Sequence, residues 1–257
     1  MTLSTEAKGV IVVLVVVALV VTGVLVYVFL YPHPGLKQSS SNWAGYVDRE
    51  KVTNVTGTFT VPPASQFNGS GTASFWVGMG GDSGLLQNTW PFWQAGLVLT
   101  TTVYGSIAEL FTEGGNGKAC GGQTCPDAWS HYINGKYGET ITVTLRGDSA
   151  GANATITLTV NGTTSVLYPP EWSVLAGVYT FPSAEWIYEA PTGFASIIES
   201  MPTIGPPGVL FSHCNDSAGL TDLGSVVMEQ NPNSQNVSFT QFVNDSFSAY
   251  SYDTQKV

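Results

Sequence analysis

Two short stretches of alternating sequence decide the fold class of this chain. Residues 140–145 read TITVTL and residues 155–160 read TITLTV, so an apolar residue follows every threonine in both. A period of two places the apolar side chains on one face of a strand and the threonines on the other. The segment between them, residues 147–153, is rich in turn-forming residues. The pair is therefore predicted to be an antiparallel hairpin with one buried face.

Short segments of the same kind continue along the chain, and Gly and Pro residues separate them. No long helical period occurs after residue 41. Many short strands with such punctuation predict one all-β domain over residues 42–257, an antiparallel β-sandwich of two packed sheets with a concanavalin-like or jelly-roll arrangement. Beside the hairpin, the predicted strands cover residues 56–61, 73–78, 92–99, 107–111, 165–168, 178–181, 184–189, 225–229 and 247–252.

The region before this domain contains an apolar segment. Residues 10–30 form 21 consecutive residues without a charge, which as a helix span about 31 Å, the thickness of a bilayer core. The alternative is a cleavable signal peptide, whose apolar region usually has about 7–15 residues. The longer run favours a single-pass transmembrane anchor at residues 10–31, between a short tail at residues 1–9 and a linker at residues 32–41.

Cysteines and sequons favour an extracytoplasmic position for the domain. Cys120 and Cys125 lie five residues apart in a Gly-rich segment, a spacing that suits a short disulfide in an oxidising compartment, and Cys214 is left over. Asn-x-Ser/Thr sequons would be surface glycosylation sites on that side of a membrane. They occur at Asn54, Asn68, Asn153, Asn161, Asn215, Asn236 and Asn244.

The charge composition excludes one class of partner. Eight Lys and Arg against eighteen Asp and Glu give a net charge of −10, which argues against nucleic-acid binding. So few cations also leave little positive self-repulsion at low pH, where carboxylates are protonated. The composition therefore suits an acidic exterior, and a Ser/Thr/Asn-rich secreted protein of neutral media is the alternative. We expect a monomer.

The strand at residues 183–189, SAEWIYE, carries two carboxylates in a chain with only 10% charged residues. Its period of two places Glu185, Ile187 and Glu189 on one face and Trp186 and Tyr188 on the other. Two glutamates on the solvent face of an ordinary sheet would produce the same pattern.

Common catalytic motifs are missing from the sequence. It has no Gly-x-Ser-x-Gly, no His-Glu-x-x-His and no phosphate-binding loop. A Ser-His-Asp triad would need His33, His131 or His213, and no motif surrounds any of them. Carboxylates and amides are left as the candidate catalytic groups, and no metal or cofactor is predicted.

Four segments in a fixed order carry a resemblance to a known family. They are SNWAG at residues 41–45, VTGTFTVP at 55–62, WVGMGG at 76–81 and AEWIYE at 184–189. Together with VNDSFS at 243–248, they resemble the glutamic peptidases (eqolisins, peptidase family G1) over nearly the whole predicted domain. The resemblance implies a β-sandwich endopeptidase that acts in acid with a Gln–Glu dyad, takes polypeptide substrates and needs no cofactor.

The resemblance assigns the catalytic glutamate to Glu189, the second one of its strand. The catalytic glutamine is assigned to Gln94, which is followed by a small residue and Gly96. Gln94 also lies fifteen residues before Glu109, which is close to the spacing in the family between the catalytic glutamine and a structural glutamate. Gln87 is the competing glutamine and lacks that glycine. The chain departs from the family at Gly80, where the family has an Asp that only Asp82 could replace, and at residues 107–113, where the family's Trp-x-Glu-Trp stretch appears only as IAELFTE.

The chemistry of these residues suits peptide hydrolysis. An ionised Glu189 would take a proton from water and pass it to the leaving nitrogen, and an ordinary Glu pKa near 4.3 would already allow this in mild acid. The Gln94 amide would donate to the oxyanion. Trp43, Trp76 and Glu109 are the expected substrate-binding residues, although the two tryptophans could equally be core aromatics.

Two other functions remain open from the sequence. One is a β-sandwich glycoside hydrolase that uses Glu109 and Glu189 as its two carboxylates. The other is a non-catalytic carbohydrate- or cell-wall-binding module that uses its Trp and Tyr side chains.

Overall fold

The computed structural model describes the greater part of the β domain. The described residues are 35–61, 66–81, 91–115, 129–133, 139–147, 152–160, 162–169, 177–192, 197–229, 231–233 and 235–253. Two compact units are distinguished, residues 1–35 and 36–257, and nearly all described residues belong to the second. Within these ranges no helix has the length and apolar character to cross a membrane. The predicted anchor at residues 10–31, Gln87, Cys120 and Cys125 lie outside the described residues.

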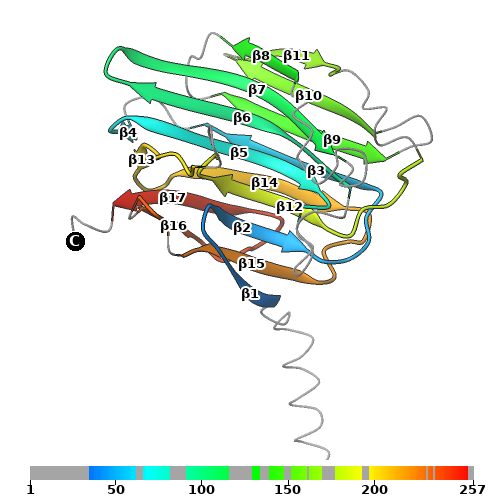
Figure 1. Ribbon diagram of the computed structural model, residues 1–257. Helices are drawn as coiled ribbons and strands as arrows, with labels where there is room; N and C mark the ends of the chain where they lie inside the picture. The colour runs from blue at the N-terminus through cyan, green and yellow to red at the C-terminus, as the bar shows by residue number, and fades with distance from the viewer. Residues whose placement is uncertain are drawn as a thin grey trace, which may run out of the picture. The chain divides into compact units, whose positions relative to one another are not determined.

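The described chain is an antiparallel β-sandwich, as predicted (Figure 1). One sheet has eight strands in the order β1-β15-β2-β12-β5-β6-β7-β8, and the other has seven in the order β11-β10-β9-β3-β14-β17-β16; β13 and β4 form a small separate pair. The strands are β1 (Gly35–Ser40), β2 (Trp43–Asp48), β3 (Asn54–Thr60), β4 (Phe67–Asn68), β5 (Gly71–Met79), β6 (Phe92–Thr102), β7 (Gly105–Gly115), β8 (Trp129–Ile133), β9 (Thr140–Gly147), β10 (Ala152–Val160), β11 (Thr163–Leu167), β12 (Ala184–Glu189), β13 (Thr203–Ile204), β14 (Val209–Asp216), β15 (Leu223–Met228), β16 (Gln235–Phe239) and β17 (Phe247–Asp253).

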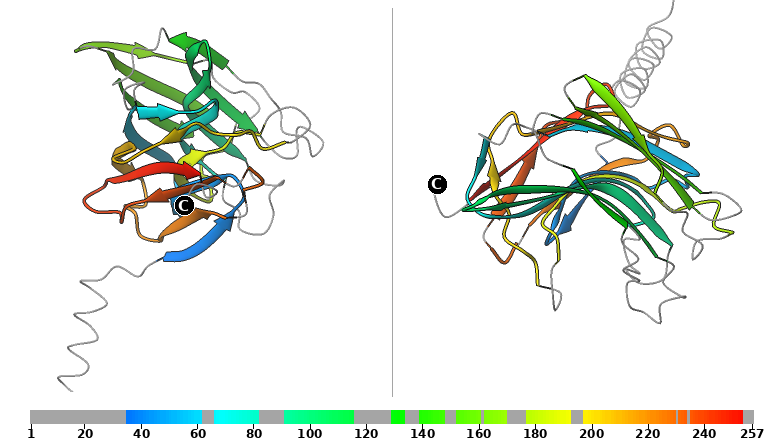
Figure 2. Two further views of the ribbon diagram at one scale, coloured as in Figure 1. Left: turned by 90° about the vertical axis from the view of Figure 1, so that its left-hand side faces the viewer. Right: turned by 90° about the horizontal axis from the view of Figure 1, so that it is seen from above.

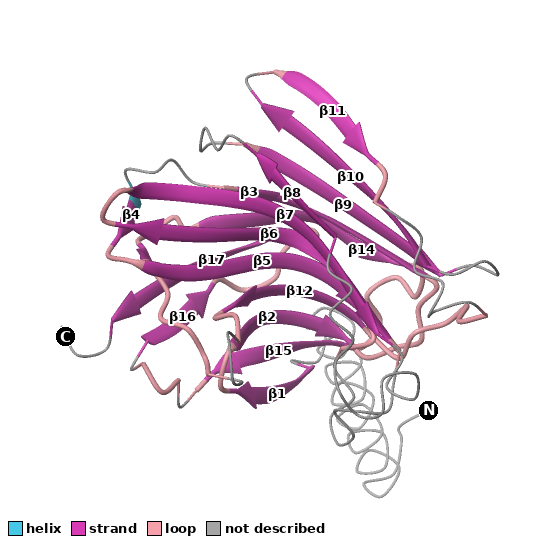
Figure 3. Ribbon diagram, turned by 45° about the horizontal axis from the view of Figure 1, so that its top comes forward, coloured by secondary structure: helices cyan, strands magenta, loops and turns pink. Residues whose placement is uncertain are grey.

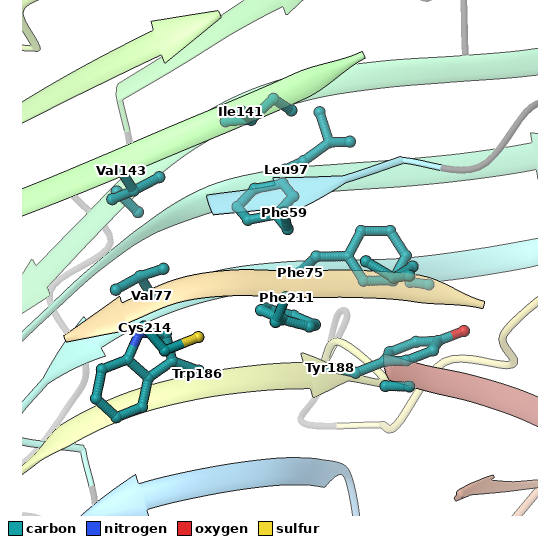
Figure 4. Close-up of a cluster of buried hydrophobic side chains, with 14 of the residues drawn as sticks. Phe59, Phe75, Val77, Leu97, Ile141, Val143, Trp186, Tyr188, Phe211 and Cys214 are labelled. Atoms are coloured by element: carbon teal, nitrogen blue, oxygen red, sulfur yellow. The ribbon is translucent and has the colours of Figure 1, made fainter. Parts of the chain in front are cut away.

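The core lies between the two large sheets, which are curved (Figures 2 and 3). Phe59 of the seven-stranded sheet packs against Phe75 of the eight-stranded sheet, with ring centroids 6.5 Å apart. Trp186 and Tyr188 project into the same cluster from β12 (Figure 4). The alternation of β12 thus directs its aromatic side chains into the core, and Glu185 and Glu189 to the opposite face of the sheet.

The hairpin that decided the fold class forms with the predicted faces. Val143 of β9 lies opposite Ile156 of β10, and both are fully buried. The prediction of a strand at residues 178–181 is wrong, because only an isolated bridge from Phe181 to Val52 forms there. Part of the predicted linker, residues 35–40, forms the edge strand β1 beside β15.

The threonines of β3 and β9 make rows on the outward face of the seven-stranded sheet. Their hydroxyl groups hydrogen-bond in pairs across the two strands, at 3.0 Å for Thr56 and Thr144 and 2.8 Å for Thr58 and Thr142. Such cross-strand pairs add a few tenths of a kcal/mol to about 1 kcal/mol each. The T-x-T pattern therefore buries one face and stabilises the other without charged groups.

Two buried carboxyl groups end β2 and β14, which belong to different sheets. Asp48 Oδ1 accepts hydrogen bonds from two backbone N–H groups, and Asp216 Oδ1 accepts from three. The Oδ2 atoms of both are buried and have no hydrogen-bond partner within the described residues. Burial first, and the charge of Asp48 second, raise the pKa of Asp216.

Candidate active site

Glu189 lies at the end of β12, on the face of the eight-stranded sheet that points away from the core. We call this surface the site face; it also carries Trp76, Gln94, Glu113 and Glu185, which the strand register places on the same side. Several side chains donate hydrogen bonds to the carboxyl group. Asn42 Nδ2 donates to Oε1 at 2.9 Å, while Trp76 Nε1 and Ser74 Oγ donate to Oε2 at 2.7 and 3.3 Å.

The pKa of Glu189 is raised to about 7. Burial is the main cause, since it disfavours the ionised form, and the negative charge of Glu113 adds to the increase. Hydrogen bonds from Trp43, Trp76 and Ser74 favour the ionised form and limit the shift. Glu189 is consequently a carboxylic acid through most of the acidic range, whereas the sequence alone predicted an ordinary glutamate.

Gln94 is fixed in the middle of the sheet by a carboxylate on the next strand. It lies on β6 directly opposite Glu113 of β7, and its Nε2 donates to Glu113 Oε2 at 2.9 Å. Burial raises the pKa of Glu113, and the hydrogen bond from Gln94 partly offsets this effect. The side chain of Glu113 thus holds the Gln94 amide in one orientation.

The register defines two parallel rows of residues across the site face, each with a polar residue at both ends. Glu189 aligns with Ser74, Val98 and Glu109 on β5, β6 and β7, and Glu185 aligns with Gly78, Gln94 and Glu113 on the same strands. Glu109 is therefore three strands from Glu189, about 14 Å between backbones at the usual strand spacing. Gln94 lies in the other row, and no hydrogen bond joins it to Glu189 among the described residues.

Trp76 and Trp43 form an aromatic wall between the two rows. Trp76 is fully buried and packs with Val47, Ile187 and Val226 in a second, smaller apolar cluster. Trp43 is half-buried and makes an edge-to-face contact with Trp76, with ring centroids 5.1 Å apart and an interplanar angle of 79°. The indole N–H of Trp76 points at Glu189, so this side chain is both part of the wall and a partner of the carboxyl group.

Glu185 is the more deeply buried of the two β12 glutamates, with 1% of its surface exposed. Its Oε1 accepts hydrogen bonds from Ser183 Oγ at 2.6 Å and from the backbone N–H of Gly81 at 2.7 Å. One donor is a buried residue only two positions away in the chain and the other is a backbone N–H, whereas the side chains of Asn42, Ser74 and Trp76 reach Glu189 from other segments.

Three residues of this site were missed from the sequence: Asn42, Ser74 and Glu113. The partner of Gln94 is Glu113, while Glu109 lies four residues away on the same face of β7. The position of the β6–β7 turn could have identified this partner. A two-residue turn at Val103 and Tyr104 fixes the register of the hairpin, and this register places Gln94 opposite Glu113. Ser74 could have been found from the alternation with Trp76 along β5.

The site face supplies the groups that acid–base hydrolysis requires. Glu189 can exchange a proton near neutral pH, Gln94 can donate to a developing oxygen charge, and Trp76 and Trp43 shield the carboxyl group from water. A glycosidase would need its two carboxyl groups about 5–10 Å apart. Glu109 and Glu189 lie three strands apart, about 14 Å between backbones, which exceeds that range.

Comparisons with known proteins were made for sequence and for structure. Residues 41–256 match the profile of the Peptidase A4 family. Among curated protein sequences, no match was found. Among solved structures, the chain is similar to scytalido-glutamic peptidase with a transition state analog inhibitor, at 19% identity over 82% of this chain and 98% of that chain, with a TM-score of 0.53.

Two further structural similarities are weaker. SCP-B, a member of the eqolisin family in a complex with the tripeptide Ala-Ile-His, has 18% identity, covers 82% of this chain and 98% of that chain, and has a TM-score of 0.47. Alginate lyase vAL-1 from Chlorella virus has 10% identity, covers 81% and 82%, and has a TM-score of 0.34. At these identities the structural comparisons bear on the fold, for which the first is the informative one.

Proposed function

The chain belongs to the Peptidase A4 family, and on this premise we propose that it is an acid-acting endopeptidase in which Glu189 is the acid/base and Gln94 stabilises the oxygen of the tetrahedral intermediate. The observation that carries the proposal is the environment of Glu189. Glu189 is buried, accepts hydrogen bonds from several side chains and has a pKa of about 7, and it lies on the same face of the sheet as an oriented amide.

The raised pKa changes the first step that the sequence suggested. Below about pH 7 the carboxyl group is protonated. One of its oxygens then gives a proton to the carbonyl oxygen of the scissile peptide, while the other takes a proton from the attacking water. The new C–O bond gives a neutral diol, and the carboxyl group is protonated again. No net charge develops on the enzyme in this step.

The second step breaks the C–N bond with the same two oxygens. Glu189 donates its proton to the leaving nitrogen and takes one from a hydroxyl group of the diol. The products are a carboxylic acid and an amine, and the enzyme returns to its starting form. Gln94 donates an N–H hydrogen bond to the substrate-derived oxygen in both steps, a contribution of about 2.7–4 kcal/mol per donor in other enzymes.

The direct test is digestion of a denatured protein at about pH 3–4 by the full chain and its Glu189→Gln variant. Glutamine keeps the shape of the side chain and loses the exchangeable proton, so peptide release is expected to stop while the melting temperature shows that the fold persists. Release that continues in Glu189→Gln overturns the proposal. Loss of activity in Gln87→Ala with retention in Gln94→Ala would move the amide role to Gln87.

We further propose that residues 10–31 anchor the protein in the membrane with the peptidase domain on the extracytoplasmic side. The uncharged run at residues 10–30 supports the anchor, and exposed sequon asparagines such as Asn68, Asn215 and Asn244 suit a glycosylated surface. Alkaline extraction of membranes tests the anchor, because a peripheral protein would be released. Protease treatment of intact cells tests the orientation, since a cytoplasmic domain would be protected.

A further inference from the structure

We propose that Glu185 is a positioning residue of this active site: its carboxylate holds the aromatic wall so that the Trp76 N–H stays on Glu189. The inference rests on the proposed function of Glu189. It concerns a group to which the proposed reaction assigns no step; Glu185 Oε1 accepts hydrogen bonds from Ser183 and from the backbone N–H of Gly81. Its role would be exerted through Trp76 and Trp43.

The side chains of Glu185, Trp76 and Trp43 converge on two glycines. A Cβ at Gly78 would lie 2.8 Å from Glu185 Oε2 and 2.7 Å from the Cζ3 atom of Trp76. A Cβ at Gly81 would lie 3.0 Å from Glu185 Oε2 and 3.1 Å from the Cη2 atom of Trp43. The absence of side chains at both positions therefore lets the carboxylate and the two ring edges pack against one patch of backbone.

This patch is linked to Glu189 by a rigid side chain. The six-membered ring edge of Trp76 lies over Gly78, next to Glu185, and its Nε1 reaches Glu189 Oε2 at 2.7 Å. The indole plane thus spans the two rows of the site face. Gly81, held by Glu185, supports Trp43, and Trp43 contacts Trp76 edge to face. Loss of the Glu185 carboxylate releases both supports of the Trp76 ring.

Two effects of Glu185 on Glu189 have opposite signs and can be separated. A negative charge on Glu185 would favour protonation of the neighbouring Glu189, so the loss of such a charge lowers the pKa of Glu189 or leaves it unchanged. Releasing the Trp76 N–H raises that pKa, because this hydrogen bond favours the ionised form. Glu185→Gln makes the first change and keeps an oxygen for Gly81 and Ser183, whereas Glu185→Ala makes both changes.

The experiment uses the full chain with ¹⁵N-labelled tryptophan and follows the indole N–H signals from pH 4 to 9. The Trp76 signal is identified by its loss in Trp76→Phe, and its titration near pH 7 is identified by its loss in Glu189→Gln. In Glu185→Ala we expect the titration of this signal to lose most of its amplitude and the alkaline decline of kcat/KM to move to higher pH, because the hydrogen bond from Trp76 favours the ionised form of Glu189. In Glu185→Gln the titration persists.

Three outcomes would decide against the inference. An unchanged Trp76 titration in Glu185→Ala would show that the carboxylate does not hold the ring. Equal loss in Glu185→Gln would assign the effect to charge. If Glu185→Ala does not fold, Ser183→Ala replaces it, because this variant removes one hydrogen bond to the carboxylate; an unchanged titration there also overturns the inference. The indole signal needs no substrate, so a failure of the proposed hydrolysis would be seen separately.

Discussion

Replacing Trp76 by phenylalanine tests the proposed chemistry at a single hydrogen bond. Phenylalanine keeps an aromatic ring in the cluster of Val47, Ile187 and Val226 but removes the N–H that lies 2.7 Å from Glu189 Oε2. This donor favours the ionised carboxylate. Its loss therefore raises the pKa of Glu189 above its present value of about 7.

The expected size of the shift follows from the type of bond. A hydrogen bond to a charged group is worth about 1.5–3 kcal/mol, and about 1.36 kcal/mol corresponds to one pH unit. The pKa of Glu189 in Trp76→Phe should thus rise by about 1–2 units. Because the protonated carboxyl group is the reactive form, the decline of kcat/KM on the alkaline side should move upward by the same amount.

The assay is the pH profile of kcat/KM for a fluorogenic peptide between pH 3 and 9, with the melting temperature recorded at each pH. Trp186→Phe is the matched control, because the Trp186 N–H donates at 2.8 Å to the backbone oxygen of Thr56, in the core. That variant should lose stability without any shift of the profile. A profile of Trp76→Phe that stays in place, or moves to lower pH, would refute the assignment of Glu189.

Three further predictions address other parts of the molecule. Gln94→Ala should lower kcat about 10²–10³-fold with little change in KM, as measured by steady-state kinetics, because a hydrogen bond to the substrate-derived oxygen acts mainly in the transition state; a change confined to KM would contradict this role. Gly96→Ala should prevent stable folding, seen as loss of the thermal transition, because its Cβ would clash with the backbone oxygen of Phe75; a cooperative transition at the normal temperature would contradict the packing. Asp216→Asn should raise the melting temperature at pH 6–7 and leave it nearly unchanged at pH 3. The folded pKa of Asp216 is raised, so its stabilising contribution is complete below the unfolded value of about 3.9 and is lost as the pH rises through the folded value; an unchanged melting temperature at pH 6–7 would exclude this mechanism.

Local alternation made much of the fold predictable. In β9 and β10, threonines alternate with apolar residues, and the structure buries Ile141, Val143, Leu145, Ile156 and Leu158. Alternation failed where the backbone departs from a regular strand. In β14 the register shifts between Ser212 and Asn215, and His213 has a φ of 52°, so the period of two is interrupted and residues 209–216 were not predicted as a strand.

The identities of the candidate catalytic groups were accessible from the sequence, but their surroundings were not. The assignments of Glu189 and Gln94 followed from motif order, and the structure places both on the site face. The partner of Gln94 depends on the position of the β6–β7 turn, because the turn sets the register of the two strands and thus determines whether Glu109 or Glu113 lies opposite Gln94. The raised pKa of Glu189 results from burial among side chains of several strands, which no local pattern records.

A peptidase is exposed to its own activity, and the threonine rows bear on its survival. The backbones of β3 and β9 are paired along their whole lengths from Asn54 to Thr60, and their hydroxyl groups are joined to each other. A peptide bond held in this way cannot be extended into the active site of a second copy. We therefore expect self-digestion in open segments such as the β6–β7 turn, where Val103 and Tyr104 are 84% and 97% exposed. The outward face of the seven-stranded sheet, which lies away from the site face, is thereby expected to resist cleavage by other copies of the enzyme.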